Sequence, residues 1–218
     1  LGSTFWNTPW IQYVDTTQAP GTQVTYRVDA SDGVATVTSY SSLPVTVAGP
    51  NGAYTAQVQA DAPLSYWRLD EAAGSTTAAD LGTTPNTSTY TSVSLGQTGA
   101  LSDGDAAASF NGSTSKVTVA SSTLPLQSFS VETWIKTSTT RGGKIVGFGS
   151  SQLGTSSRFD RHLYMSNDGK VQFGVYSGVY SIIRSTSALN DNKWHHLVGT
   201  FTPGSQAFYV DGALQGTT

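Results

Sequence analysis

Short runs of alternating apolar and polar residues, separated by tight-turn signals, constrain the fold of this chain more than any other feature. Residues 22–31 alternate in this way. Such a period is typical of a half-buried strand, because successive side chains of a strand point to opposite faces. Ser31-Asp32-Gly33 follows the run and favours a hairpin turn. Together with residues 34–40, the run therefore predicts a β-hairpin.

Strand signals recur at regular spacing along the rest of the chain, and Asn167-Asp168-Gly169 and Asp211-Gly212 add hairpin turns. We expect further strands at residues 44–47, 107–110, 116–120, 129–136, 144–149, 161–165, 170–176, 179–185, 194–201 and 207–210. Residues 75–105 are rich in Thr, Ser, Gly and Asp, and we expect loops there with one short strand. No segment shows helical periodicity over a useful length. The sequence therefore predicts an all-β fold, either a sandwich or a jelly roll.

Composition excludes several functional classes. Charged residues make up 11% of the chain, against about a quarter in a typical soluble domain. The net charge of −3 with only 11 Lys and Arg leaves no basic stripe, so we expect no nucleic-acid partner. No apolar run approaches the roughly 20 residues that span a bilayer, so we expect no membrane insertion. The absence of cysteine excludes disulfides, thiol catalysis and Cys-type zinc sites.

A cluster of structure-breaking residues divides the chain. Ala48-Gly49-Pro50-Asn51-Gly52 has no apolar pattern, and we take it as a domain boundary. The predicted organisation is a first domain at 1–48, a linker at 49–53 and a second domain at 54–218. The chain starts without Met and stops after the first half of an apparent hairpin. We therefore expect a piece of a longer protein.

The first domain resembles the C-terminal part of a fibronectin type III-like domain. The resemblance lies in Asp15-Thr16-Thr17, in Ala19-Pro20-Gly21-Thr22 and in Thr25-Tyr26-Arg27-Val28-Asp29-Ala30. These segments match a strand pair of that family. The resemblance implies a partial fibronectin III-like sandwich.

The second domain carries five motifs that occur together in one family. They are Tyr66-Trp67-Arg68-Leu69-Asp70-Glu71 with Ala79-Asp80, Ala108-Ser109-Phe110-Asn111-Gly112, Phe129-Ser130-Val131-Glu132-Thr133-Trp134-Ile135, Lys193-Trp194-His195-His196-Leu197-Val198 and Phe208-Tyr209-Val210-Asp211-Gly212. In this order they resemble the laminin G-like jelly roll of the concanavalin A-like lectin/glucanase superfamily. The resemblance implies an antiparallel jelly-roll sandwich that lacks its last strands. We expect Trp67, Trp134 and Trp194 in its core.

Catalytic residues are not evident. Concanavalin A-like sandwiches include glycoside hydrolases, which need two carboxylates flanking the scissile bond. The only glutamates are Glu71 and Glu132, which lie in different motifs. His195 and His196 are adjacent in one strand and therefore point to opposite faces. We therefore predict that the chain is not an enzyme.

Two candidate binding features remain. The resemblance implies a possible Ca²⁺ at a loop rim, and Asp80 matches the acidic position of the family; the alternative is an ordinary turn aspartate. Tyr176 and Tyr180 flank the turn Ser177-Gly178 and are candidate ligand-binding residues, because sugar faces stack on exposed rings. The alternative for the tyrosines is a structural role without a ligand.

The resemblance implies a non-catalytic adhesion or carbohydrate-binding module of a large modular protein, either a secreted bacterial protein or a phage tail protein. Its partner would be a surface or cell-wall polysaccharide, and its location extracellular, at the cell surface or at the virion surface. A second interpretation is a structural spacer or decoration domain of a virion or filament that contacts neighbouring structural protein chains. A third is an accessory module of a glycoside hydrolase.

Overall fold

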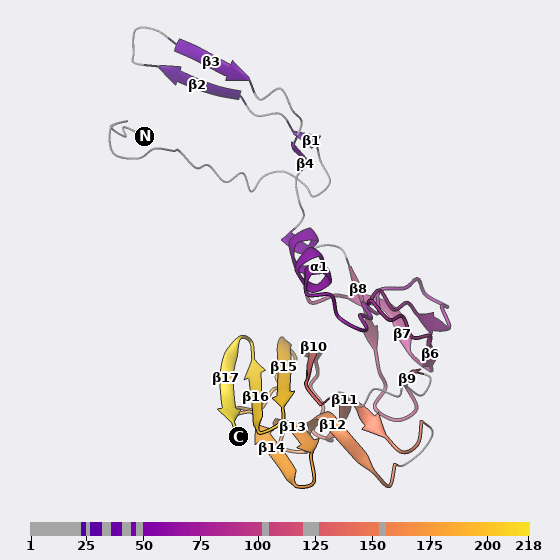
Figure 1. Ribbon diagram of the computed structural model, residues 1–218. Helices are drawn as coiled ribbons and strands as arrows, with labels where there is room; N and C mark the ends of the chain where they lie inside the picture. The colour runs from indigo at the N-terminus through magenta and orange to yellow at the C-terminus, as the bar shows by residue number, and fades with distance from the viewer. Residues whose placement is uncertain are drawn as a thin grey trace. The chain divides into compact units, whose positions relative to one another are not determined.

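A computed structural model of the chain describes residues 23–24, 27–31, 36–40, 45–46, 50–101, 105–119, 127–152 and 156–218. The chain divides into two units, and Figure 1 labels strands of both units and the single helix of the described residues. Unit 1 comprises Leu1–Leu64 and Leu101–Asp105, and unit 2 comprises Ser65–Ala100 and Ala106–Thr218. The predicted domain boundary at 49–53 stays a prediction.

Unit 1 contains two antiparallel strand pairs. Strand β1 (Gln23–Val24) pairs with β4 (Val45–Thr46), and β2 (Arg27–Ser31) pairs with β3 (Thr36–Tyr40). The pairing of β2 with β3 confirms the predicted hairpin. The motifs at 15–17 and 19–22 lie outside the described residues, and the fibronectin-like interpretation stays a prediction.

One helix, α1 (Pro50–Ala60), overlaps the linker expected at 49–53 and continues into the start of the second domain expected from residue 54. The prediction that no segment is helical is therefore wrong. Proline is tolerated in the first turn of a helix, where its missing N–H has no partner to lose. Alanine and glutamine, which favour helix, supply several of the later positions. The Gln57 amide also donates to Asp61 Oδ1 one turn further on. No helix in the described part of the chain is long and apolar enough to cross a membrane.

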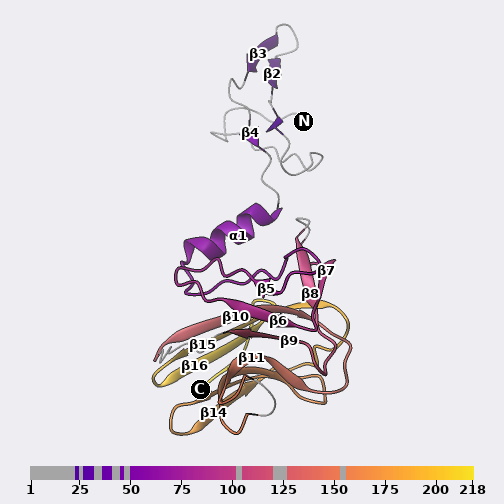
Figure 2. The same cartoon turned by 90° about the vertical axis from the view of Figure 1, so that its right-hand side faces the viewer.

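Unit 2 is built from antiparallel strands, which confirms the all-β fold class. Two four-stranded sheets, here called sheet I and sheet II, form stacked layers (Figure 2). In spatial order, sheet I contains β10 (Phe129–Lys136), β15 (Trp194–Thr202), β16 (Ser205–Val210) and β17 (Ala213–Thr217). Sheet II contains β11 (Gly143–Gly149), β12 (Phe159–Met165), β13 (Val171–Tyr176) and β14 (Tyr180–Arg184).

The remaining strands form two smaller sheets. They are β5 (Thr77–Ala78), β6 (Ser88–Thr91) and β9 (Lys116–Val119) in one sheet, and β7 (Ser94–Thr98) and β8 (Ala106–Ser109) in the other. The segment 75–105 thus contains more strand than the single short one expected. Its Thr and Ser residues suit strands as well as loops, so composition alone did not separate the two.

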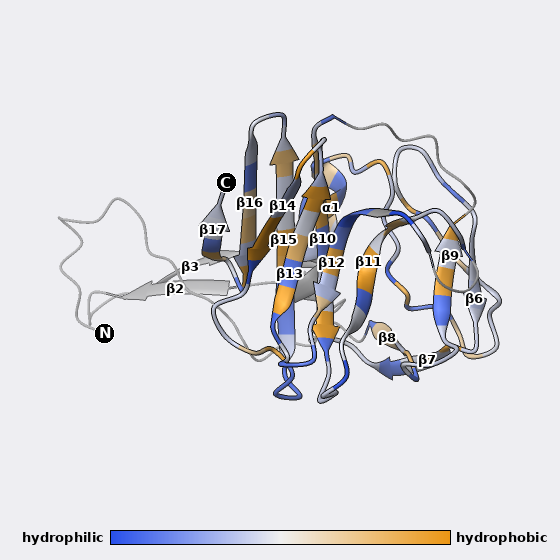
Figure 3. Ribbon diagram, turned by 90° about the horizontal axis from the view of Figure 1, so that it is seen from below, coloured by the Kyte–Doolittle hydropathy of each residue, from blue (hydrophilic) through white to orange (hydrophobic). Residues whose placement is uncertain are grey.

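The hydrophobic core lies between sheets I and II. Alternate residues of each strand point inward, and Leu163, Phe173, Leu197 and Phe208 are completely buried. Figure 3 shows the corresponding apolar stripes along these strands. Phe173 packs against Phe208 with ring centroids 6.3 Å apart. The buried Gln206 donates a hydrogen bond from sheet I to the Phe173 carbonyl of sheet II, at 2.9 Å. Apolar contacts and this bond together fix how the two sheets pack.

The tryptophans do not form the core, so that prediction is wrong. Trp67, Trp134 and Trp194 are only half-buried. Trp134 and Trp194 occupy strand positions that alternate with the buried Leu197 and the core-packed Ile135. Because strand side chains alternate, both rings lie on the outer face of sheet I.

Candidate functional site

The outer face of sheet II is defined by the residues that alternate with the core positions. The strand register arranges these residues in three rows across the sheet. The first row is Lys144, Tyr164, Gln172 and Arg184; the second is His162, Gly174 and Ile182; the third is Tyr176 and Tyr180. We call this surface the outer face of sheet II throughout.

Tyr176 and Tyr180 form a cross-strand pair at one end of this face. Their ring centroids lie 4.9 Å apart, with the planes inclined by 47°. The exposed fractions are 49% and 74%, so both rings are open to solvent. The Tyr176 N–H donates to Asp160 Oδ1 at 2.8 Å, which anchors the strand at this point. The structure thus brings the two predicted ligand-binding residues together in an exposed aromatic pair.

The middle row of the face has a glycine at its centre. Gly174 lies between His162 and Ile182, and a Cβ there would be only in ordinary contact with Ile182, at 3.6 Å. His162 is fixed by a 2.7 Å hydrogen bond between Nε2 and the Phe148 carbonyl. Burial lowers the pKa of His162, and the charge of Lys144 acts in the same direction. His162 therefore favours the neutral form, and its ring is held by the bond to Phe148.

The first row places charged groups at the other end of the face. Lys144 is exposed, and Arg184 pairs with Asp168 at 2.5 Å between Nη2 and Oδ2. The Gln172 amide donates to Ser166 Oγ at 2.6 Å, which holds it between the two cations. The outer face of sheet II is therefore aromatic at one end and positively charged at the other.

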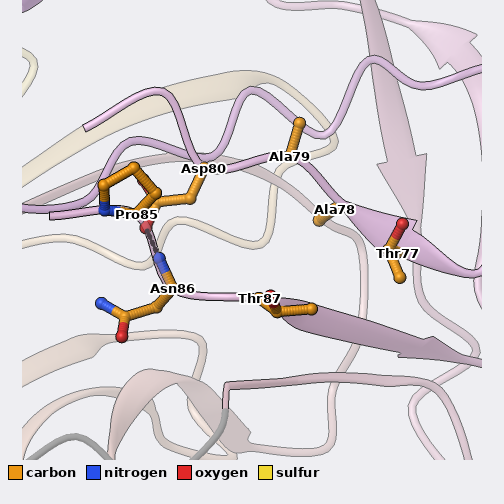
Figure 4. Close-up of a pocket in the computed structure, with 7 residues that line it drawn as sticks. All are labelled: Thr77, Ala78, Ala79, Asp80, Pro85, Asn86 and Thr87. Carbon is orange, nitrogen blue, oxygen red and sulfur yellow. Dashed lines mark hydrogen bonds between the residues drawn. The ribbon is translucent and has the colours of Figure 1, made fainter. Parts of the chain in front are cut away.

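Asp80 lies at a separate, open pocket of about 230 Å³ (Figure 4). Its Oδ1 accepts backbone N–H groups from Tyr66 and Gly82 at 2.7 and 2.9 Å, and its Oδ2 accepts that of Asn86 at 2.9 Å. Partial burial opposes ionisation, but these bonds outweigh it and lower the pKa of Asp80. Asp80 thus ties the segment at Tyr66 to the loop that contains Gly82 and Asn86.

This arrangement bears on the calcium interpretation. Carbonyl and carboxylate oxygens must converge on a Ca²⁺ ion, whereas N–H donors converge on the Asp80 carboxylate. Within the described ranges, no group of three or more His, Asp or Glu side chains is placed to hold a metal. The contacts favour a structural role for Asp80, and calcium binding there stays a prediction.

The two glutamates belong to separate polar clusters. Glu71 accepts the Tyr90 hydroxyl at 2.5 Å and the Ala79 N–H at 2.6 Å. Glu132 lies on β10, where its Oε1 is 2.9 Å from His196 Nε2. Each carboxylate therefore has its own partners on different elements.

A third cluster was not anticipated from the sequence. His195 Nδ1 lies 2.8 Å from Asp211 Oδ2, and its Nε2 lies 3.0 Å from Asp191 Oδ1. The spacing of four residues between Asp191 and His195 was visible in the sequence. The contact with Asp211 depends on the β15–β16 register, which the sequence does not show. His196 points away from this cluster, as the alternation of strand side chains predicted.

Comparison with known families supports the fold of unit 2. Residues 111–218 match the laminin G-like family model described as the concanavalin A-like lectin/glucanases superfamily. The match agrees with the resemblance that the motifs carry, and the antiparallel strands of this part are consistent with a jelly-roll sandwich. The matched range covers the last three of the five motifs and the end of the second.

Two solved structures are similar at low identity. One is an S-layer domain-containing protein (residues 221–444) from Clostridium thermocellum, with 21% identity, 71% coverage of both chains and a TM-score of 0.44. The other is the native heptameric SAP-like pentraxin from Limulus polyphemus, with 21% identity and a TM-score of 0.31. The pentraxin match covers 42% of this chain and 43% of the pentraxin chain. A search of curated proteins gave no significant match.

Proposed function

We propose that the chain is a non-catalytic carbohydrate-binding module and that it binds its ligand on the outer face of sheet II. The observation that carries the proposal is the exposed pair of Tyr176 and Tyr180. Large exposed apolar groups on a soluble protein mark interaction sites. Sugar rings present C–H groups that stack on aromatic faces, while tyrosine hydroxyls remain available for hydrogen bonds. An open aromatic pair at the end of a sheet face suits an extended sugar chain.

The rest of the face supports a polar ligand. Tyr164 and Gln172 supply hydrogen-bonding groups in the first row, between Lys144 and Arg184. Gly174 carries no side chain, so the face is low at this position, beside the exposed Ile182. Binding of this kind is weak for one module, and repetition along a modular protein makes it useful through avidity.

We also infer the setting of this module. A wall or surface polysaccharide as partner places the protein outside the cell or on a particle surface, as in secreted bacterial proteins and phage tail proteins. The low charge and the absence of cysteine are compatible with such a setting. The absence of catalysis is part of the proposal, and the separate hydrogen-bond partners of Glu71 and Glu132 support it.

A second candidate function is contact with neighbouring protein chains. Val179 and Ile182 are 71% and 55% exposed beside the tyrosines, and aliphatic groups favour a protein surface over a sugar. This observation supports the structural spacer interpretation.

Binding to immobilised wall and surface polysaccharides tests the proposal. We expect Tyr180→Ala to lower the affinity about tenfold, which corresponds to about 1.4 kcal/mol, and Tyr176→Ala to have a similar effect. Leu214→Ala is the matched control, because Leu214 is 54% exposed but lies on sheet I. If the Tyr176/Tyr180 double variant bound with the same affinity as the unaltered protein, the proposed site would be contradicted. Absence of binding to all polysaccharides would favour the structural spacer.

A further inference from the structure

The charge of sheet II is opposite to that of the whole chain. Residues 143–185 carry five Lys or Arg and two Asp, a formal charge of +3, whereas the chain has a net charge of −3. Both acidic residues are already paired inside this sheet, Asp160 with Arg161 and Asp168 with Arg184. The positive charge is therefore a local property of this sheet.

The positive charge on the outer face lies at one end. Lys144 and Arg184 occupy the two edges of the first row. Lys170 immediately precedes β13, where alternation places it on the same side as Gln172. Among the residues that the structure describes, Lys144 and Lys170 form no ion pair. Against the single Asp168 carboxylate, these cations leave a net positive end.

The separation between the two ends limits the ligand. Gln172 in the first row and Tyr176 in the third are four residues apart on β13. At about 3.3 Å per residue, this spacing corresponds to roughly 13 Å along the strand. A single sugar ring cannot reach both the tyrosine pair and the cations. A ligand that uses the whole face must be a chain of several sugars.

Resting on the proposed carbohydrate-binding function, we infer that the ligand is an acidic polysaccharide that lies along β13. Its sugar rings contact Tyr176 and Tyr180, and its anionic groups lie near Lys144, Lys170 and Arg184. Carboxylates or phosphodiesters satisfy this chemistry equally. Arg184 can keep Asp168 as a partner while its remaining N–H groups face the ligand. The exposed cations also attract an anionic chain over a distance of about a Debye length.

Matched polymers test this inference on the full chain. The probes are polygalacturonate, alginate and hyaluronan, each compared with its methyl ester, together with a phosphodiester-linked wall polymer. We expect at least one acidic polymer to bind, with affinity that falls as NaCl is raised. Where that polymer is a polyuronate, its ester should bind at least tenfold more weakly. Binding of the phosphodiester polymer alone would identify phosphate as the anionic group.

Single substitutions measure the contributions of the cations and of the aromatic pair to binding separately. Lys144→Gln and Lys170→Gln should each lower the affinity for acidic polymers about threefold. Lys136→Gln is the control, because Lys136 is an exposed lysine on sheet I. If neutral polymers bind as tightly and Tyr180→Ala abolishes that binding, the inference of an acidic ligand fails and the carbohydrate site stands. If no polymer of either kind binds, both fail.

Discussion

The imidazole of His196 stacks on the indole of Trp134, with ring centroids 4.7 Å apart and planes inclined by 27°. The two residues are directly opposite each other on β15 and β10, and His196 Nε2 also contacts Glu132. Both rings are half-buried on the outer face of sheet I. Trp134 therefore acts as part of a cross-strand pair and does not fill the core.

This geometry predicts how much Trp134→Ala lowers the free energy of unfolding. We expect the free energy of unfolding to fall by about 2 kcal/mol, less than the 3–5 kcal/mol typical of a core aromatic residue, with the fold retained. A double-mutant cycle with His196→Ala should give a coupling energy of about 0.5–1.5 kcal/mol. Urea unfolding followed by circular dichroism measures both quantities. A loss of 4 kcal/mol or more would instead place the indole in the core.

The contacts of His195 predict that the stability of the fold depends on pH. Burial opposes its protonation, but the bonds to Asp211 and Asp191 outweigh burial and raise its pKa. Both ring nitrogens face carboxylates, so only the protonated ring can donate to both. The contribution of His195 is therefore complete below its unfolded pKa of about 6.5. It is lost as the pH rises through the higher folded value.

The two aspartates act in the opposite direction at low pH. Hydrogen bonds from the Lys193 N–H and then from His195 lower the pKa of Asp191 to about 2, and the pKa of Asp211 is also lowered. Their contribution is present above about pH 4 and is lost as the pH falls through the folded values. We expect maximal stability between about pH 4 and 6.5. His195→Asn should remove the decline that begins above about pH 6.5, and His196→Asn is the control. Thermal unfolding across this range measures the effect, and an unchanged slope in His195→Asn would contradict it.

Local signals explain what could be predicted from the sequence. The turns at Asp168-Gly169 and Asp211-Gly212 and the alternation in β13 depend on neighbouring residues, and the structure has those hairpins. Tyr176 and Tyr180 could be paired for the same reason, because they flank one short turn. The contact of His195 with Asp211 and the rows across sheet II depend on strand register between distant segments. Register is set by the complete core and by turn geometry, and no single run of residues contains it.

The position of Trp134 could have been predicted better. It shares its alternation with Glu132 and Lys136, whereas Val131 and Ile135 take the other set of positions. That pattern places the indole on the polar face. The size and hydrophobicity of an indole favour the core, and in this strand the alternation overrides them. Helix α1 begins with Pro50-Asn51-Gly52, residues that are typical of turns, so the sequence does not indicate a helix there.

Gly199 and Gly174 should respond differently to the same substitution. A Cβ at Gly199 would come within 2.7 Å of the Phe173 ring in the core, whereas a Cβ at Gly174 would meet Ile182 at 3.6 Å on the outer face. We therefore expect Gly199→Ala to lower the free energy of unfolding by about 1–3 kcal/mol through overpacking. Gly174→Ala should change it by less than about 0.5 kcal/mol. Denaturant titration of the two variants compares them directly, and equal effects would show that the core adjusts around position 199.

Substitutions at Asp80 test whether this residue is a structural aspartate or a calcium ligand. Asp80→Ala leaves the N–H groups of Tyr66, Gly82 and Asn86 without their acceptor, and we expect a loss of about 3 kcal/mol. Asp80→Asn should cost less, since one oxygen can still accept from Tyr66 and Gly82. The lowered pKa of Asp80 adds stability that is present above about pH 4 and is lost as the pH falls through the folded value.

Calcium and a chelator complete this test. The N–H donors occupy the Asp80 carboxylate, so we expect the same melting temperature for the protein in calcium and in a chelator. A ligand that binds only the folded state raises the melting temperature with its concentration. A calcium-dependent rise that Asp80→Asn abolishes would therefore establish the metal site and would require the three N–H groups to turn away. A rise that survives Asp80→Asn would place calcium elsewhere in the chain and leave Asp80 with its structural role.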